Sequence, residues 1–87
     1  MKFVDTAINK TERYSIGKEV ESGRFYLAIP VSNRLVDYEE YYQIDATAHE
    51  RYPANSTQLG AFADECRARK HDNLLFIPPG KERGYAT

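Results

Sequence analysis

The segment from Arg24 to Ile44 constrains the fold more than any other part of this chain. Apolar residues occupy every second position from Phe25 to Val31, and a second apolar set follows the dipeptide Asn33-Arg34. A period of two over this length predicts a strand with one buried face. Asn tolerates tight reversals of the backbone, so we expect an antiparallel hairpin with a two-residue loop at Asn33-Arg34.

The register of this hairpin follows from its faces. A two-residue loop predicts Val31 opposite Val36. A slip by one residue would move every side chain to the other face, so the register that keeps the apolar side chains together is favoured. The same register sets Glu40 opposite Leu27 on the apolar face. We therefore expect Glu40 to reach the rim of the sheet, to meet a cation, or to lie at a β-bulge.

The other face of the hairpin carries tyrosines and acids. The chain has seven tyrosines, and Tyr26 and Tyr41 are predicted to pair on this face beside Asp37 and Glu39. Aromatic anchors next to acidic groups suit a protein interface with a basic partner. Tyrosine also has strand propensity, so plain sheet surface is an equal alternative. The main helix could instead cover this face, because the pattern does not show which face it covers.

Further strands are expected on both sides of the hairpin in the sequence. Residues 14–21 predict a first strand, with Gly17 as a candidate bulge, and would complete a three-stranded meander. The apolar run 74–77 ends at Pro78 and predicts a buried strand next to the hairpin or the first strand. Residues 1–13 fit either a helical turn or the beginning of a strand.

One main helix is predicted over residues 56–70, and a short helix can begin near residues 47–50 and end at Pro53. The apolar residues of the main helix fall on one stripe at 100° per residue. They are Leu59, Phe62, Ala63 and Cys66. The predicted fold is therefore α+β, with an antiparallel sheet of about four strands and this helix packed on one face. The polar tail, residues 81–87, is expected to be mobile, with Tyr85 as its one candidate anchor.

Length and composition bound the class of protein. Eighty-seven residues predict one domain, 1–87, and a net charge of −1 gives no reason to expect nucleic-acid binding. No apolar run reaches the length of a membrane span, and the first residues lack the apolar core of a secretory leader. A single cysteine excludes an internal disulfide, so we expect a cytoplasmic protein.

No catalytic, cofactor-binding or metal-binding site is predicted. Cys66 and His71 lie five residues apart, but no third group that would orient them is visible, and Cys66 lies on the apolar stripe of the helix. The chain has too few cysteines and histidines for a structural zinc site. Asp37 and Glu39 share a face, which is more typical of a solvated acidic strand than of an acid–base pair. No glycine-rich phosphate loop is present.

These features favour a non-enzymatic protein-binding module, for example a small inhibitor or an immunity-type protein. Its interface would be formed by Tyr26, Asp37, Glu39 and Tyr41, and its partner would be another protein, one that is basic. Two alternatives stay open. The chain could form a small homo-oligomer that binds a ligand, paired through an edge strand or through residues 74–77. It could also be an enzyme with a site between helix and sheet.

Overall fold

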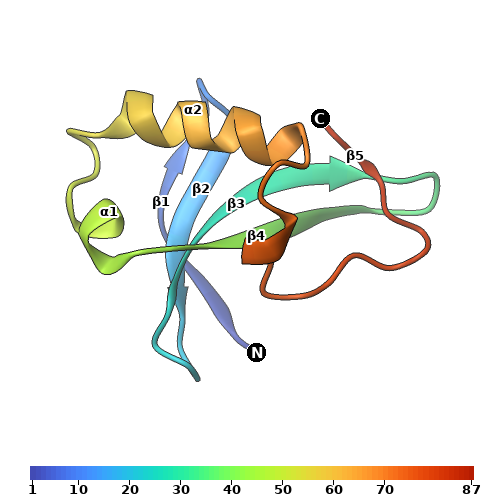
Figure 1. The fold of residues 1–87 in the computed structure, drawn as a ribbon, viewed down its shortest axis with the longest axis horizontal. Coiled ribbons are helices and arrows are strands. Elements are labelled where there is room, and N and C mark those ends of the chain that lie inside the picture. Colours follow the sequence, from blue (N-terminus) through green and yellow to red (C-terminus); the bar gives the residue numbers. More distant parts are fainter.

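The computed structural model describes residues 1–87 and places a twisted antiparallel sheet beneath one long helix (Figure 1). This arrangement confirms the predicted α+β fold class. The strand order is β1-β2-β3-β4, and the short β5 also pairs with β3. The strands are β1 (Phe3–Asn9), β2 (Tyr14–Glu19), β3 (Phe25–Ser32), β4 (Asp37–Ile44) and β5 (Tyr85–Ala86), and the helices are α1 (Ala46–Glu50) and α2 (Ser56–Arg67).

Helix α2 covers the apolar face of the hairpin, as the alternation predicts. Leu59, Ala63 and Cys66 of its stripe are buried against the sheet. Their partners alternate along β3 and β4 and are Leu27, Ile29, Val31, Tyr42 and Ile44. Residues of α1 and of the segment that follows it pack on the edge of the same cluster. Both helices therefore lie on one face of the sheet, which we call the covered face.

The loop of the hairpin is longer than predicted. Asn33 Oδ1 accepts hydrogen bonds of 2.8 Å from the backbone N–H groups of both Leu35 and Val36. This side-chain cap closes a four-residue loop from Asn33 to Val36, so the predicted two-residue loop is wrong. Leu35 and Val36 are 78% and 56% exposed, and neither belongs to the strand.

The register consequently differs from the prediction by two residues. Val31 lies opposite Tyr38 rather than Val36, and Ile29 lies opposite Glu40. A shift of two leaves every side chain on its predicted face, because strand side chains alternate with a period of two. The periodicity therefore identified the two faces correctly while the pairing depended on the Asn33 cap.

Two other predicted elements differ in the structure. Residues 74–77 do not form a strand: a 3₁₀ turn spans Asp72–Leu74, Leu75 makes a single bridge with Tyr42, and Pro78 and Pro79 offer no N–H to a ladder. Helix α2 ends at Arg67, before the predicted residue 70. Arg69 adopts a φ of 61°, its N–H bonds Cys66 O, and Lys70 N–H bonds Glu65 O, a Schellman ending.

Both ends of the chain pair with the sheet. Residues 3–9 resolve the earlier ambiguity as a strand, with an irregularity between Asp5 and Ala7. In the C-terminal tail predicted to be mobile, β5 pairs with the end of β3, and Gly84 N–H donates to the Tyr38 hydroxyl at 2.7 Å. A Cβ at Gly84 would lie 2.2 Å from Ser32 O, so only glycine allows this approach.

Neither helix has the length and apolar character needed to cross a membrane.

Candidate functional site

The face of the sheet opposite α2, here called the open face, has its own small aromatic cluster. Tyr26, Ala28 and Phe76 are buried there, with Phe3 and Tyr41 packed against them. The rings of Phe3 and Tyr41 stack with centroids 3.7 Å apart, and Tyr26 meets Tyr41 edge to face at 5.0 Å. This cluster fixes one end of the open face.

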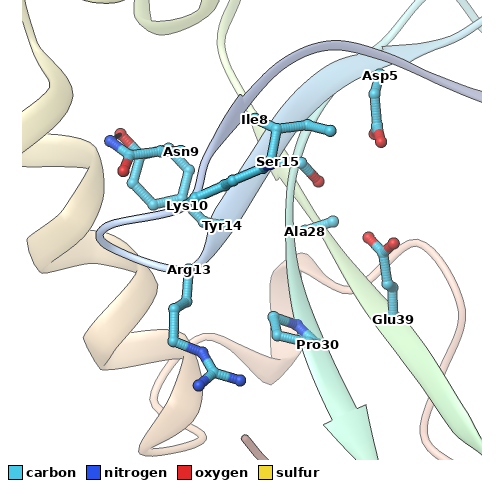
Figure 2. A pocket seen from close by; sticks show the side chains of 10 residues that line it. All are labelled: Asp5, Ile8, Asn9, Lys10, Arg13, Tyr14, Ser15, Ala28, Pro30 and Glu39. Atoms are coloured by element: carbon cyan, nitrogen blue, oxygen red, sulfur yellow. Dashed lines mark hydrogen bonds between the residues drawn. The ribbon is translucent and has the colours of Figure 1, made fainter.

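Beside the aromatic cluster, the open face is hollowed. The hollow has a volume of about 360 Å³ and a floor formed by the small residues Ser15 and Ala28 of the two central strands. Asp5 and Glu39 lie on one side, where Figure 2 shows their carboxylates pointing toward each other across open space. Lys10, in the turn after β1, and Arg13 also line it.

Asp5 and Glu39 differ in their surroundings. Asp5 Oδ1 accepts the hydrogen bond of the Tyr26 hydroxyl, and both burial and this carboxylate raise the pKa of Tyr26. Desolvation and then the charge of Asp5 raise the pKa of Glu39 above its ordinary range, against a smaller opposing effect of the Ser15 hydroxyl. Glu39 is exposed overall, but the ionised form of its carboxylate is less favourable here than in water.

No cation of the chain forms an ion pair with Asp5, Asp37 or Glu39 on this face. Its five ion pairs lie elsewhere, and none includes Asp5, Asp37 or Glu39. Asp37 accepts a hydrogen bond of 2.7 Å from the hydroxyl of Ser32, which is a neutral donor. The open face thus presents three carboxylates that have no cationic partner.

The predicted site residues lie together, but not all are accessible. Asp37 and Glu39 are exposed, Tyr41 is half-buried, and Tyr26 is fully buried in the aromatic cluster, edge to face with Phe3. Tyr26 can therefore act only by positioning Asp5 and supporting Tyr41. The structure brings Asp5 into the site, a residue that sequence reasoning missed. The irregularity between Asp5 and Ala7 interrupts the alternation of side chains between the two faces of β1, so the pattern does not place Asp5 on the open face.

No protein-family model, curated protein or solved structure matches this chain. The geometry of the molecule alone therefore decides what the site can do.

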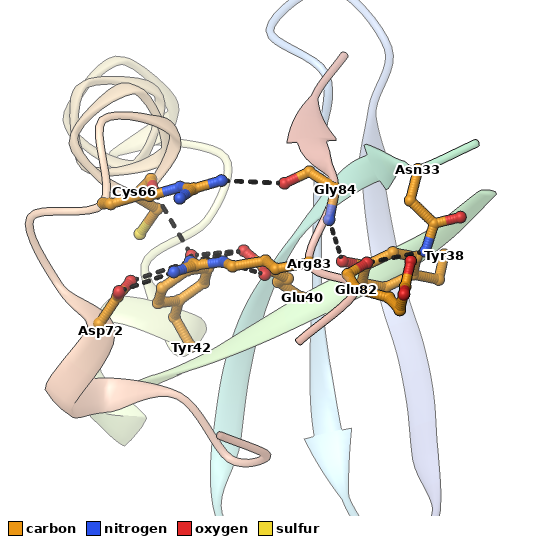
Figure 3. Close-up of polar contacts among 10 residues, drawn as sticks. Asn33, Tyr38, Glu40, Tyr42, Cys66, Asp72, Glu82, Arg83 and Gly84 are labelled. Carbon is orange, nitrogen blue, oxygen red and sulfur yellow. Dashed lines mark hydrogen bonds and ion pairs between the residues drawn. The ribbon is translucent and has the colours of Figure 1, made fainter. Parts of the chain in front are cut away.

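A second polar cluster lies at the covered face and connects the C-terminal segment to β4 (Figure 3). Arg83 donates to Glu40 Oε2 at 2.8 Å and to Asp72 Oδ2 at 2.7 Å, and Tyr42 OH donates to Glu40 Oε1 at 2.9 Å. The Arg83 guanidinium lowers the pKa of Asp72. Glu40 thus meets a cation, one of the outcomes expected for it. The cluster holds the C-terminal segment against β4.

Cys66 and His71 do not form a reactive pair. Cys66 is 1% exposed, and burial, followed by the charge of Glu65, raises the pKa of its thiol to about 12. The His71 ring stacks on Phe62 and its Nε2 lies 2.7 Å from Glu65 Oε1. A thiol held neutral in this way is a poor nucleophile. The fold brings together no group of three or more His, Cys, Asp or Glu side chains that could hold a metal ion.

Proposed function

We propose that this protein is a non-enzymatic protein-binding module that uses its open face to hold a basic segment of a partner protein. A small inhibitor or an immunity-type protein would work in this way. The observation that carries the proposal is a hollow lined by Asp5 and Glu39, with Asp37 on the same strand face as Glu39, and none of these three carboxylates forms an ion pair within the chain.

Charge complementarity supports a basic partner. Dehydration and Asp5 disfavour the ionised form of Glu39, so a cation entering the hollow would relieve an unfavourable charge. An ammonium or guanidinium group from a partner supplies that charge. Glu39 would then gain in the complex the pairing that it lacks in the free protein.

The aromatic cluster supports an interface with a fixed shape. Tyr41 is half-buried, stacks on Phe3 and keeps part of its ring at the surface next to Glu39. Tyrosine at the edge of a packed cluster contributes contact area at a low entropic cost, which is typical of interface hot spots. Because Tyr41 and Glu39 both project from β4, their spacing is set by a regular strand rather than by a loop.

Site-specific photocrosslinking tests this function. A benzoylphenylalanine placed at Gln43, on the exposed open-face side of β4, should capture a protein in cells of the source organism, and the captured peptide should contain Lys or Arg. The same group at Ala61, exposed on α2, is the matched control. Capture at position 43 should disappear in Asp37→Ala and in Tyr41→Ala. Equal capture at both positions, or capture that survives both substitutions, would remove the open face as the interface.

One observation favours a small apolar ligand as a second candidate. A hollow of about 570 Å³ lies beside the helices, lined by apolar side chains that include Ile44, Leu59 and Phe62. The fluorescence of anilinonaphthalene sulfonate would report binding there. Gln58→Trp, at an exposed position in the same hollow, should fill it and abolish the signal. Unchanged fluorescence in that variant would exclude this site.

A further inference from the structure

The hollow of the open face has ends of opposite charge. Asp5 and Glu39 lie at one end, and Lys10 and Arg13 also belong to its lining. Lys10 is exposed and forms no ion pair, and the Arg13 guanidinium donates to the neutral hydroxyl of Thr87 at 3.1 Å. Figure 2 shows Arg13 on the side of the hollow away from Asp5. Neither the acids nor the bases of the hollow are therefore held in an ion pair, which leaves their charges available to a ligand.

The separation of the two ends selects the size of the ligand. Asp5 lies in β1, which is irregular between Asp5 and Ala7, and Lys10 follows the end of that strand, so a rise of about 3.3 Å per residue separates their backbones by at most about 16 Å. A free amino acid carries its ammonium and carboxylate on one carbon and cannot span this distance. In an extended peptide, side chains four residues apart share a face and lie about 13 Å apart, within reach of both ends.

The middle of the hollow suits an apolar residue of the bound peptide, halfway between its two charged residues. Ile8 of β1 is 62% exposed there, and Ala28 and Pro30 of β3 also line the hollow. The residue halfway between two charges four apart projects toward the same side as they do. A β-branched apolar side chain at that position would cover Ile8.

Resting on the proposed function, we infer that the docked segment of the partner is an extended strand with a basic and an acidic residue four positions apart. The basic side chain enters between Asp5 and Glu39, and the acidic one meets Lys10 and Arg13. Charge alone would make any cationic protein a partner, whereas this arrangement requires a particular spacing and so gives specificity.

Short synthetic peptides test the spacing directly. Two probes carry charges four apart in either direction, acetyl-KTVTE-amide and acetyl-ETVTK-amide, and a control of the same composition, acetyl-KTVET-amide, places the charges on opposite faces. Titration of ¹⁵N-labelled protein gives affinities and maps the amides that shift. We expect one of the two probes to bind about five-fold more tightly than the control, with shifts at Asp5, Ser15 and Glu39. Equal affinity of all three peptides would overturn the inference.

Variants separate this inference from the function on which it rests. Glu39→Gln and the double variant Lys10→Gln/Arg13→Gln should each weaken binding of the favoured peptide about five-fold, whereas Lys70→Gln, exposed after α2, should not. If only Glu39→Gln weakens binding, the inference of a segment with two opposite charges is wrong, but the proposal of a basic partner remains. If no peptide binds but position 43 captures a basic partner, the inference alone is overturned. Absence of both peptide binding and capture overturns both proposals.

Discussion

Glu39 and Glu40 are neighbours in the sequence and point to opposite faces of β4, and their surroundings differ in almost every respect. Glu40 is 9% exposed and bonds to both Arg83 and Tyr42. Glu39 faces a hollow that it shares with Asp5 and has no cation within ion-pair distance. One carboxylate is part of the folded structure, and the other is left unpaired on the surface.

The same contrast holds for the two faces as wholes. On the covered face, α2 closes the apolar core and Arg83 pairs the carboxylates that remain there. On the open face, a few aromatic rings provide rigidity, and three acids stay unpaired. Substitutions on the covered face should therefore reduce stability, while substitutions of the open-face acids should reduce binding and leave stability almost unchanged.

The largest effect is expected from Arg83→Met, which breaks the covered-face cluster. The change leaves Glu40 buried without its cation, and loss of one partner of a buried ion pair typically costs about 3–5 kcal/mol. Urea unfolding followed by circular dichroism measures the free energy of unfolding. Arg34→Met, exposed in the hairpin loop, is the matched control and should have little effect. A loss of stability no larger than that of Arg34→Met would show that the cluster does not hold the tail.

The aromatic cluster of the open face should be the next most sensitive region. A Cβ at Gly17 would lie 2.1 Å from Val4 O and 2.4 Å from the Tyr26 hydroxyl oxygen. Gly17→Ala should therefore lower the free energy of unfolding by about 1–3 kcal/mol through overpacking. Gly80→Ala meets nothing within 4 Å and serves as the control. Equal stability of the two variants would mean that Tyr26 does not pack closely over β2.

A smaller effect, present at neutral pH and lost in acid, is expected from Glu19. Its carboxylate accepts hydrogen bonds from the N–H groups of Lys2, Glu21 and Ser22, and these lower its pKa from 4.5 to about 2. Its contribution is complete above its unfolded pKa and is lost as the pH falls toward 2. The stability of the wild-type protein should thus fall between pH 5 and about 2 more steeply than that of Glu19→Gln. Parallel pH profiles would contradict this role.

The smallest effect on stability is expected from Asp37→Asn. Asp37 is exposed and forms only one hydrogen bond, to Ser32, so the free energy of unfolding should change by no more than about 0.5 kcal/mol. Capture of a partner at position 43 should nevertheless decrease. A variant that loses stability and capture together would indicate that Asp37 acts by supporting the hairpin.

Local patterns in the sequence predicted the faces of the hairpin and the main helix, because periodicity decides which residues are buried. The register could not be obtained in this way, since a shift of two residues leaves the faces unchanged and the Asn33 cap sets the loop. Glu40 could be expected to need a cation, but Arg83 lies 43 positions away in a segment that resembles a polar tail.

The candidate site was predicted only in part, for a related reason. Asp37, Glu39 and Tyr41 follow from alternation along one strand. Tyr26 is buried in a cluster with Phe3 and Phe76, which come from distant parts of the chain. Asp5 enters the site through a strand whose pattern is interrupted. Contacts between distant segments, which no local pattern reveals, therefore determine which predicted residues are accessible.

The paired substitutions Glu39→Gln and Glu40→Gln give the most direct test of the contrast between the two faces. At pH 7, loss of the charge of Glu40 should lower the free energy of unfolding by about 1–3 kcal/mol, because charge-assisted bonds to Arg83 are weakened. The raised pKa of Glu39 means that its ionised form disfavours folding, so Glu39→Gln should leave stability unchanged or slightly increased. Equal destabilisation by both substitutions would contradict the account.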